Sequence, residues 1–205
     1  MEFSKIKNKG QARLFRNDYI ETMTKTHPVV VYCMYFPVII LMLYYGNVYR
    51  GLSAGYEAIL FFSGILFWTL FEYLMHRFLF HMVVESERGK KIVYIMHGVH
   101  HEFPRDKERL FMPPVPSLIT ACIIFFIMHL IMGWKALSFF PGFLFGYIAY
   151  GSMHYAIHAF TPPGFLKALW RNHHLHHYKN PDKGFGVSSV LWDIVFSTVP
   201  KKEEE

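Results

Sequence analysis

The sequence predicts an all-α integral membrane protein with four transmembrane helices, arranged as two hairpins beneath a histidine-rich cytosolic cap. Two observations lead to this fold class. The 205-residue chain is 53% hydrophobic and contains four long apolar segments, and most of its 13 histidines fall into two short windows. A chain of this length is long enough for one domain or one membrane unit, so we expect a single membrane-embedded domain over residues 1–205.

Four apolar segments are long enough to cross a bilayer, at about residues 29–48, 56–80, 115–132 and 136–157. At a helical rise of about 1.5 Å per residue, an 18-residue run covers roughly 27 Å, close to the hydrocarbon thickness of a membrane. A soluble helix needs a polar face, whereas these segments are apolar all round, which disfavours a soluble bundle. Short links at 46–55 and 133–135 join the segments into two hairpins.

Basic residues flank the apolar segments and predict the orientation of the chain. Of the 21 Lys and Arg residues, 19 lie within 1–28, 77–110 and 159–205, which leaves only Arg50 and Lys135 elsewhere. The positive-inside rule therefore places both termini and the central loop in the cytoplasm. The membrane is expected to be a bacterial inner membrane or the endoplasmic reticulum.

The cytosolic parts are then an N-terminal arm, residues 1–28, and a cap formed by 81–114 and 158–200. The basic residues do not form one stripe, so the net charge of +6 does not indicate nucleic-acid binding. Cys33 and Cys122 both lie inside apolar runs. Neither a disulfide framework nor a cysteine zinc site is indicated.

Eleven of the 13 histidines lie within 76–101 and 154–177, about a quarter of the chain. The strays, His27 and His129, are interpreted as structural. Ten of the clustered histidines form spaced pairs and trios: His76, His81, His97, His100, His101, His154, His158, His173, His176 and His177. Residues three or four apart share one face of a helix, so each trio projects its imidazoles to one side. His76 and His81 are five residues apart, which corresponds to about 140° around an α-helix. Two arrangements are therefore open: the two side chains approach one metal site from different directions, or each binds a different metal.

Ten clustered imidazoles repel one another when protonated and need many hydrogen-bond partners when neutral. Metal ions resolve both problems, since histidine binds metals as neutral imidazole, and ten ligands suit two ions. Imidazole alone suits zinc, copper, iron or nickel. A Phe-rich membrane core beneath the site favours a lipid acyl chain as substrate. Attack on its unactivated C–H bonds requires O₂ and a redox metal, which excludes zinc as the working metal.

Five segments resemble the fatty acid hydroxylase/sterol desaturase superfamily, over roughly residues 72–198: EYLMHRFLFHM, MHGVHHEFPRDKERLFMPPVPS, GYIAYGSMHYAIH, HHLHHY and GFGVSSVLWDIVFST. The pattern HGxHHxxPxDxxRLxxPP, from His97 to Pro114, most resembles the fatty acid 2-hydroxylase branch. The resemblance implies a di-iron enzyme that uses O₂ to hydroxylate C2 of a fatty acid, free or in a sphingolipid. It also implies that the ten spaced histidines are the metal ligands, with zinc able to replace iron on overexpression.

Relatives in this superfamily often carry a cytochrome b5 domain ahead of the membrane part. This sequence lacks the HPGG haem motif, and HPVV at His27 is no substitute. A separate electron donor, cytochrome b5-like or ferredoxin-type, is therefore expected. The basic cytosolic loops are able to dock such a donor, or they serve only to set the topology.

Five further positions carry expectations of their own. Glu72 precedes His76 by four residues, so its carboxylate is expected to orient that imidazole. For Asp193 three roles are considered: its carboxylate orients a histidine of the cap, forms an ion pair with a nearby basic group, or caps a turn. Gly184 and Gly186 in GFG are expected to form a tight turn. His174 falls at the flank of the 173–177 helix and is predicted not to bind metal.

Two alternatives remain open at the level of sequence. A sterol or carotenoid hydroxylase or desaturase of the same superfamily would use the same histidines. A haem-binding or metal-transporting membrane protein is more remote. Haem would require histidines paired across the spans, and transport would require ionisable residues along a path through the bilayer.

Overall fold

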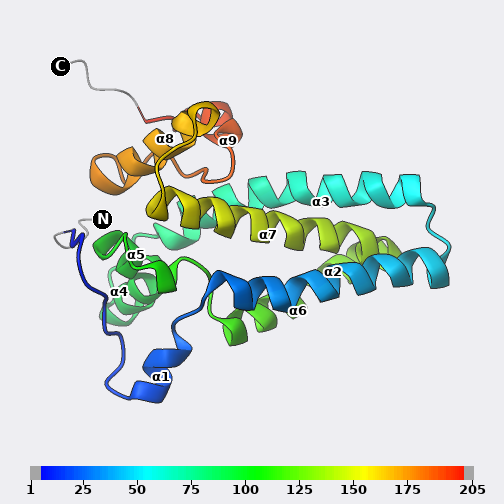
Figure 1. Cartoon of the computed structure of the whole chain (residues 1–205), viewed down its shortest axis with the longest axis horizontal. Coiled ribbons are helices and arrows are strands. Elements are labelled where there is room, and N and C mark those ends of the chain that lie inside the picture. Colours follow the sequence, from blue (N-terminus) through cyan, green and yellow to red (C-terminus); the bar gives the residue numbers. More distant parts are fainter. Residues whose placement is uncertain (1–5, 201–205) are drawn as a thin grey trace.

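The computed structural model describes residues 6–200, and within this range it contains helices and no strands. The predicted all-α class is therefore confirmed for the described residues. Four long helices form a bundle, and the shorter helices gather at one end of it (Figure 1). The long helices are α2 (Pro28–Arg50), α3 (Ala54–Leu74), α6 (Pro114–Met132) and α7 (Ala136–Ala159).

The first hairpin is defined by residues that end one helix and begin the next. Gly51 ends α2 in the left-handed conformation, at φ 67°, which costs glycine little. The Ser53 side chain then accepts a hydrogen bond from the Tyr56 amide and caps α3. At the other end of α2, Pro28 occupies the first turn and His27 caps it by accepting from the Val29 amide.

The second hairpin joins α6 to α7 through the 3₁₀ turn η4 (Gly133–Lys135). Its helices begin and end within two residues of the predicted segments 115–132 and 136–157. Three stretches are long and apolar enough to cross a membrane: Pro28–Arg50, Ala54–Phe80 and Lys107–Ala159, the last of which contains both α6 and α7.

The backbones of α3 and α7 are in close contact in the part of the bundle away from the cap. A Cβ atom on Gly64 would lie 2.1 Å from the Phe139 carbonyl oxygen, and one on Gly142 would lie 1.9 Å from the Phe61 carbonyl oxygen. Only glycine allows the two backbones to approach this closely. Aromatic side chains such as Trp68 and Phe143 fill the space along the same interface.

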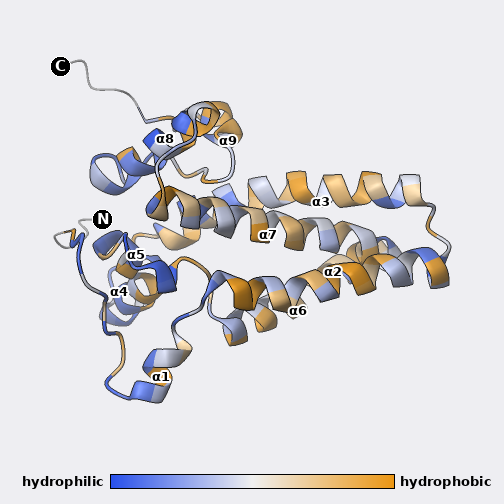
Figure 2. Ribbon diagram, in the orientation of Figure 1, coloured by the Kyte–Doolittle hydropathy of each residue, from blue (hydrophilic) through white to orange (hydrophobic). Residues whose placement is uncertain are grey.

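Shorter helices build the cap, and Figure 2 shows that many of their residues are hydrophilic. At the left-hand end of the bundle in Figure 1, the lower part of the cap contains α1 (Asp18–Met23), α4 (Glu87–Val93), η2 (Tyr94–Gly98), α5 (Val99–Glu102) and η3 (Lys107–Arg109). The upper part of the cap, at the same end, contains η5 (Gly164–Leu166), α8 (Lys167–Tyr178) and α9 (Leu191–Val195). The π-helical turn η1 (Met75–Phe80) extends α3 into the cap.

The N-terminal arm is bound along the segment that carries the HGxHH motif. The Lys7 amide donates to the Glu102 carbonyl oxygen at 2.7 Å, and the Thr26 amide donates to the Glu108 carbonyl oxygen at 2.9 Å. Between these two points, Arg109 bonds Glu21 of α1 and, at 2.6 Å, Asp106. The Asp and Arg of the HGxHHxxPxDxxRL pattern thus form a buried ion-pair network that fixes the arm against the motif.

Candidate metal centre

Ten buried or half-buried histidines converge in the cap, in two groups of five. The first group takes residues from η1, the position directly after η1, η2, α5 and α8, and the second takes residues from α5, α7 and α8. In each group the five ring nitrogens lie within 4.8 Å of one another. The first group is His76, His81, His97, His101 and His176; the second is His100, His154, His158, His173 and His177.

Each trio is divided between the groups. His97 and His101 belong to the first group, whereas His100 belongs to the second. Likewise, His173 and His177 belong to the second group and His176 to the first. As predicted, the three imidazoles of each trio project to the same side of their helix. They nevertheless reach two different groups, because that side of the helix lies between the two groups.

His76 and His81 lie in the same group because the helix changes its pitch between them. Residues 75–80 form a π-helical turn, and the His81 amide donates to the His76 carbonyl oxygen at 3.2 Å, five residues back. In a π-helix, residues five apart return to the same side, unlike in an α-helix. The separation of about 140°, calculated for an α-helix, does not apply here.

The Nε2 atoms of the histidines face one another at short range. In the first group, His97 Nε2 lies 3.0 Å from both His76 Nε2 and His101 Nε2. In the second group, His154 Nε2 lies 2.9 Å from His100 Nε2. With metal–nitrogen bonds of about 2.1 Å, neighbouring ligands at right angles on one ion are about 3 Å apart. The spacing therefore fits imidazoles arranged around an ion.

Hydrogen bonding alone does not account for this arrangement. A neutral imidazole nitrogen carries either one proton or one lone pair in the ring plane. His97 Nε2 therefore cannot make good hydrogen bonds to both His76 and His101. A metal ion satisfies all these lone pairs at once, and the donor set of neutral imidazoles suits zinc, iron, copper or nickel.

Burial keeps these imidazoles neutral, which is the form that binds metal. Removal from solvent, aided by the neighbouring His76, lowers the pKa of His81 to about 3. Burial likewise lowers the pKa well below its usual range for His97, His100, His101, His173, His176 and His177. The lone pairs are thus available at neutral pH.

Backbone carbonyls fix the orientation of two ligands in the first group. The Phe185 carbonyl oxygen lies 2.6 Å from His76 Nδ1, and the Lys183 carbonyl oxygen lies 2.7 Å from His176 Nδ1. A carbonyl only accepts, so each Nδ1 carries the proton and each Nε2 lone pair points into the group. One loop, residues 183–188, therefore sets the tautomer of both rings.

Two carboxylates hold that loop, and this corrects the expected role of Glu72. His76 Nδ1 pairs with Phe185, whereas the Glu72 carboxylate accepts from the amides of Val187 and Ser188 at 2.7 and 2.9 Å. Asp193 accepts from the amides of Phe185 and Gly186 at 3.0 and 2.8 Å. Of the three roles considered for Asp193, capping a turn is the one observed.

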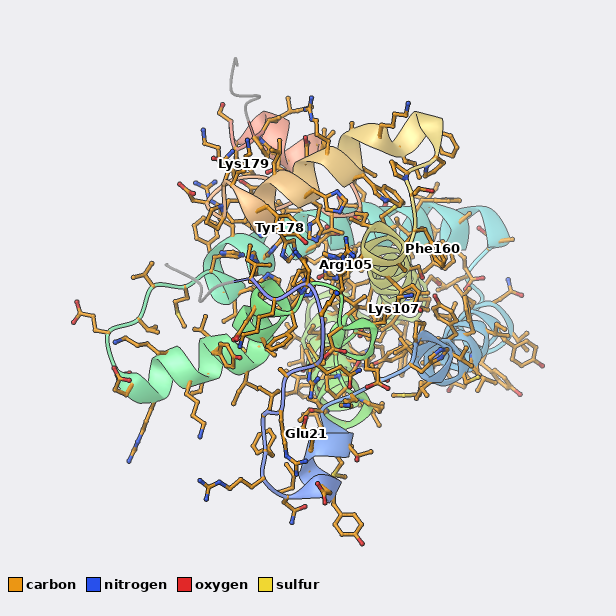
Figure 3. The ribbon with its side chains drawn as sticks, turned by 60° about the vertical axis from the view of Figure 1, so that its left-hand side comes forward. Glu21, Arg105, Lys107, Phe160, Tyr178 and Lys179 are labelled. Atoms are coloured by element: carbon orange, nitrogen blue, oxygen red, sulfur yellow. The ribbon has the colours of Figure 1, made fainter. Side chains whose placement is uncertain are left out.

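The remaining sequence predictions have clear outcomes. Gly184 adopts φ 73°, as expected for the tight turn in GFG. His174 is exposed on α8 and belongs to neither histidine group. It contacts Tyr178, which lies on the same end of the molecule as Arg105 (Figure 3). His129 Nδ1 lies 3.1 Å from the Gly133 carbonyl oxygen, at the opposite end of the bundle, and has a structural role.

The sequence profile described as fatty acid hydroxylase matches residues 61–198, which include all ten histidines. The chain belongs to the fatty acid hydroxylase family. A solved structure described as full-length scs7p, with only its hydroxylase domain visible, has the same fold, with a TM-score of 0.88 and 36% identity. The match covers 96% of this chain and 75% of that chain.

Three curated members of the fatty acid hydroxylase family are similar over nearly all of this chain. The ceramide very long chain fatty acid hydroxylase SCS7 of Saccharomyces cerevisiae is 39% identical, covering 93% of this chain and 50% of the yeast protein. The dihydroceramide fatty acyl 2-hydroxylase FAH2 of Arabidopsis thaliana is 36% identical, with coverages of 92% and 80%. The human fatty acid 2-hydroxylase is 36% identical, with coverages of 93% and 57%. The chain thus spans about half the length of the yeast and human relatives.

The loop that orients the first histidine group could not be predicted from side-chain motifs. Its functional atoms are the backbone carbonyl oxygens of Lys183 and Phe185, which no side-chain motif reveals. The available signal was the GFG turn, because tight turns leave backbone carbonyls to be bound by neighbouring side chains.

Proposed function

We propose that this chain hydroxylates C2 of a fatty acyl chain, free or within a sphingolipid, in an O₂-dependent reaction at two iron ions. The observation that carries the proposal is the convergence of ten neutral imidazoles in two groups of five. The names of the yeast, plant and human relatives support an acyl chain as substrate and C2 as the position attacked.

Two bound irons would activate O₂, the oxidant, with two electrons from the donor, so that an unactivated C–H bond is hydroxylated and water is the second product; no protein side chain supplies this chemistry. The protein supplies the ligands: His76, His81, His97, His101 and His176 for one ion, and His100, His154, His158, His173 and His177 for the other. Zinc is expected to compete for these sites on overexpression, since it binds imidazole well. The buried walls of the two groups exclude bulk water from the reacting centre.

Glu72 and Asp193 are proposed as positioning residues that act through the 183–188 loop. Glu72 binds the far side of the loop, and Asp193 binds its GFG turn. If either carboxylate is lost, the Phe185 carbonyl is free to move away from His76. Partners of this kind orient metal-binding histidines and raise their affinity for the metal.

We further propose one membrane-embedded domain in which α2, α3, α6 and α7 cross the bilayer, with both termini and the metal centre in the cytoplasm. The apolar composition of these helices and the position of 19 basic residues support this orientation. Electrons would come from a separate cytochrome b5-like or ferredoxin-type protein.

Lipid analysis tests the proposed reaction directly. The chain is expressed in a host without 2-hydroxylated lipids, together with a reductase and a donor protein, and total fatty acids are analysed by mass spectrometry. We expect 2-hydroxy fatty acids with the native chain and with His174→Ala, and none with His100→Ala. Altered sterols or carotenoids alongside unchanged acyl chains would overturn the assignment and favour the other branch of the superfamily.

A further inference from the structure

The C-terminal part of the cap has the composition of a membrane-facing segment. Residues 184–199, GFGVSSVLWDIVFSTV, contain one charged side chain, that of Asp193. This carboxylate is fully buried and points inward, where it accepts hydrogen bonds from the Phe185 and Gly186 amides and the Thr198 hydroxyl. The outer surface of the segment therefore carries no charge.

Large apolar side chains cover that outer surface. Leu191, Ile194, Val195 and Phe196 are 42, 61, 56 and 44% exposed, respectively. Figure 2 shows α9 as a hydrophobic ribbon beside the hydrophilic α8. A contiguous exposed patch of this kind marks an interaction site with a membrane or a protein.

The patch continues the apolar outer surface of α3. Trp192 donates its indole N–H to the Thr69 hydroxyl at 2.9 Å, and the ring of Phe196 stacks on Tyr73 at 5.2 Å. One to two turns further along α3, Phe62 and Leu66 are likewise exposed. The exposed side chains of α9 and the outer face of α3 therefore form one continuous apolar surface.

The depth of this contact places α9 within the hydrocarbon layer. A core about 30 Å thick is crossed by about 20 helical residues, so a span that begins at Ala54 leaves it near Leu74. Thr69 lies five residues before that point, or about 7 Å inside the layer. The backbone of α9 suits this position, because the amides of Ile194, Phe196, Ser197 and Thr198 all donate to carbonyls within the segment.

We infer that α9 and its flanks, residues 190–196, lie in the acyl-chain layer of the membrane. The inference depends on the proposed crossing of α3 but not on the chemistry of the metal centre. One short segment then contacts lipid acyl chains on its outer face and, through Asp193 and Phe185, orients His76 on its inner face. Only the segment that contains Phe185 and Asp193 then separates His76 of the first histidine group from the lipid acyl chains.

Spin labels on single cysteines test this placement. In the full-length chain with Cys33→Ala and Cys122→Ala, a nitroxide is attached at Ile194→Cys or Val195→Cys. Leu66→Cys on α3 serves as a lipid-exposed reference, and Ala168→Cys, exposed on α8, serves as a water-exposed reference. Each protein is reconstituted in phosphatidylcholine vesicles, and its metal content and elution volume are checked against the unlabelled chain.

Collision with O₂, which partitions into lipid, is compared with collision with a water-soluble nickel chelate. We expect the labels at 194 and 195 to give O₂-to-nickel ratios close to that of Leu66 and several-fold above that of Ala168. A ratio near that of Ala168 would place α9 in water and overturn the inference. Protection from both reagents would indicate contact with protein, such as a second copy, and would also overturn it.

Discussion

Glu72 of α3 accepts a hydrogen bond from the amide of Val187, 115 residues further along the chain, at 2.7 Å. The contact joins the membrane bundle to the loop whose Phe185 carbonyl oxygen accepts from His76 Nδ1. Since Glu72 and His76 lie one turn apart, the same stretch of helix supplies both a metal-binding ring and the anchor of the group that orients it. The orientation of His76 therefore depends on two contacts in series.

Replacing Glu72 should weaken metal binding without removing a ligand. Glu72→Gln keeps one acceptor oxygen, so we expect metal affinity to fall about 10-fold, and about 100-fold for Glu72→Ala. Equilibrium dialysis followed by elemental analysis measures this change. Glu57→Gln is the matched control, because Glu57 lies at the far end of α3, where it accepts from Ser138. Equal losses in Glu57→Gln and Glu72→Gln would show that the effect is not transmitted through the loop.

Replacing the histidines of α8 one at a time should affect metal content and activity differently at different positions. His173→Ala and His177→Ala each vacate a place in the second group, and we expect each variant to retain fewer than two metals and to lose turnover. His174→Ala alters an exposed ring outside both groups and should retain both metals and most of the activity. Elemental analysis of the three purified variants decides the outcome. Loss of a metal from His174→Ala, with retention in His173→Ala, would show that the ligands are assigned wrongly.

Loss of the buried ion pair beside α1 should destabilise the cap. The side chains of Arg109 and Glu21 are 4 and 11% exposed, respectively. Glu21→Ala leaves a buried charge without one of its partners, which costs about 3–5 kcal/mol in comparable cases. Asp18→Ala on the same helix removes an exposed pair with Arg13 and should cost about 1 kcal/mol or less. Thermal unfolding in detergent compares the two variants, and similar losses would argue against the network.

Asp193 should give the protein a distinctive dependence on pH. Burial raises the pKa of this carboxyl above its usual range, although Thr198 and the loop amides oppose the shift. The folded state then binds the proton of this carboxyl more tightly than the unfolded state does. This contribution to stability is fully present below the pKa of the unfolded state, and it is lost as the pH rises through the pKa of the folded state. Asn is not ionised at any of these pH values, so Asp193→Asn should gain stability relative to the native chain as the pH rises from about 4, the unfolded pKa of an aspartate, through the folded pKa. Melting temperatures at three pH values measure this difference, and a constant difference would contradict it.

Hydrophobic patterning was sufficient to predict the helices of the bundle. The segment 29–48 corresponds to Pro28–Arg50, and 136–157 corresponds to Ala136–Ala159. Caps and glycines such as Ser53 and Gly51 determine where these helices begin and end, and such signals are local. The histidine spacing likewise identified the ten residues that converge, because histidines three or four residues apart share a helix face; the pair His76 and His81 converges through the π-helical turn instead.

Contacts between distant segments could not be read from the sequence. The π-helical turn that unites His76 and His81 depends on packing in the cap, and the division of each trio between two groups depends on how α5, α7 and α8 meet. The pairing of Glu72 with Val187 involves a backbone amide, which any residue at that position would supply. A spacing of four residues therefore led to His76 as the expected partner of Glu72.

The most direct test of the account is the number of metal ions bound per chain. The chain is purified without chelators from iron-supplemented cells, and metals and protein are quantified by elemental analysis and amino-acid analysis of the same sample. Two groups of five imidazoles predict two ions per chain, of iron in active preparations and of zinc where zinc has replaced it. A value near one, or no bound metal in folded protein, would contradict a dinuclear centre.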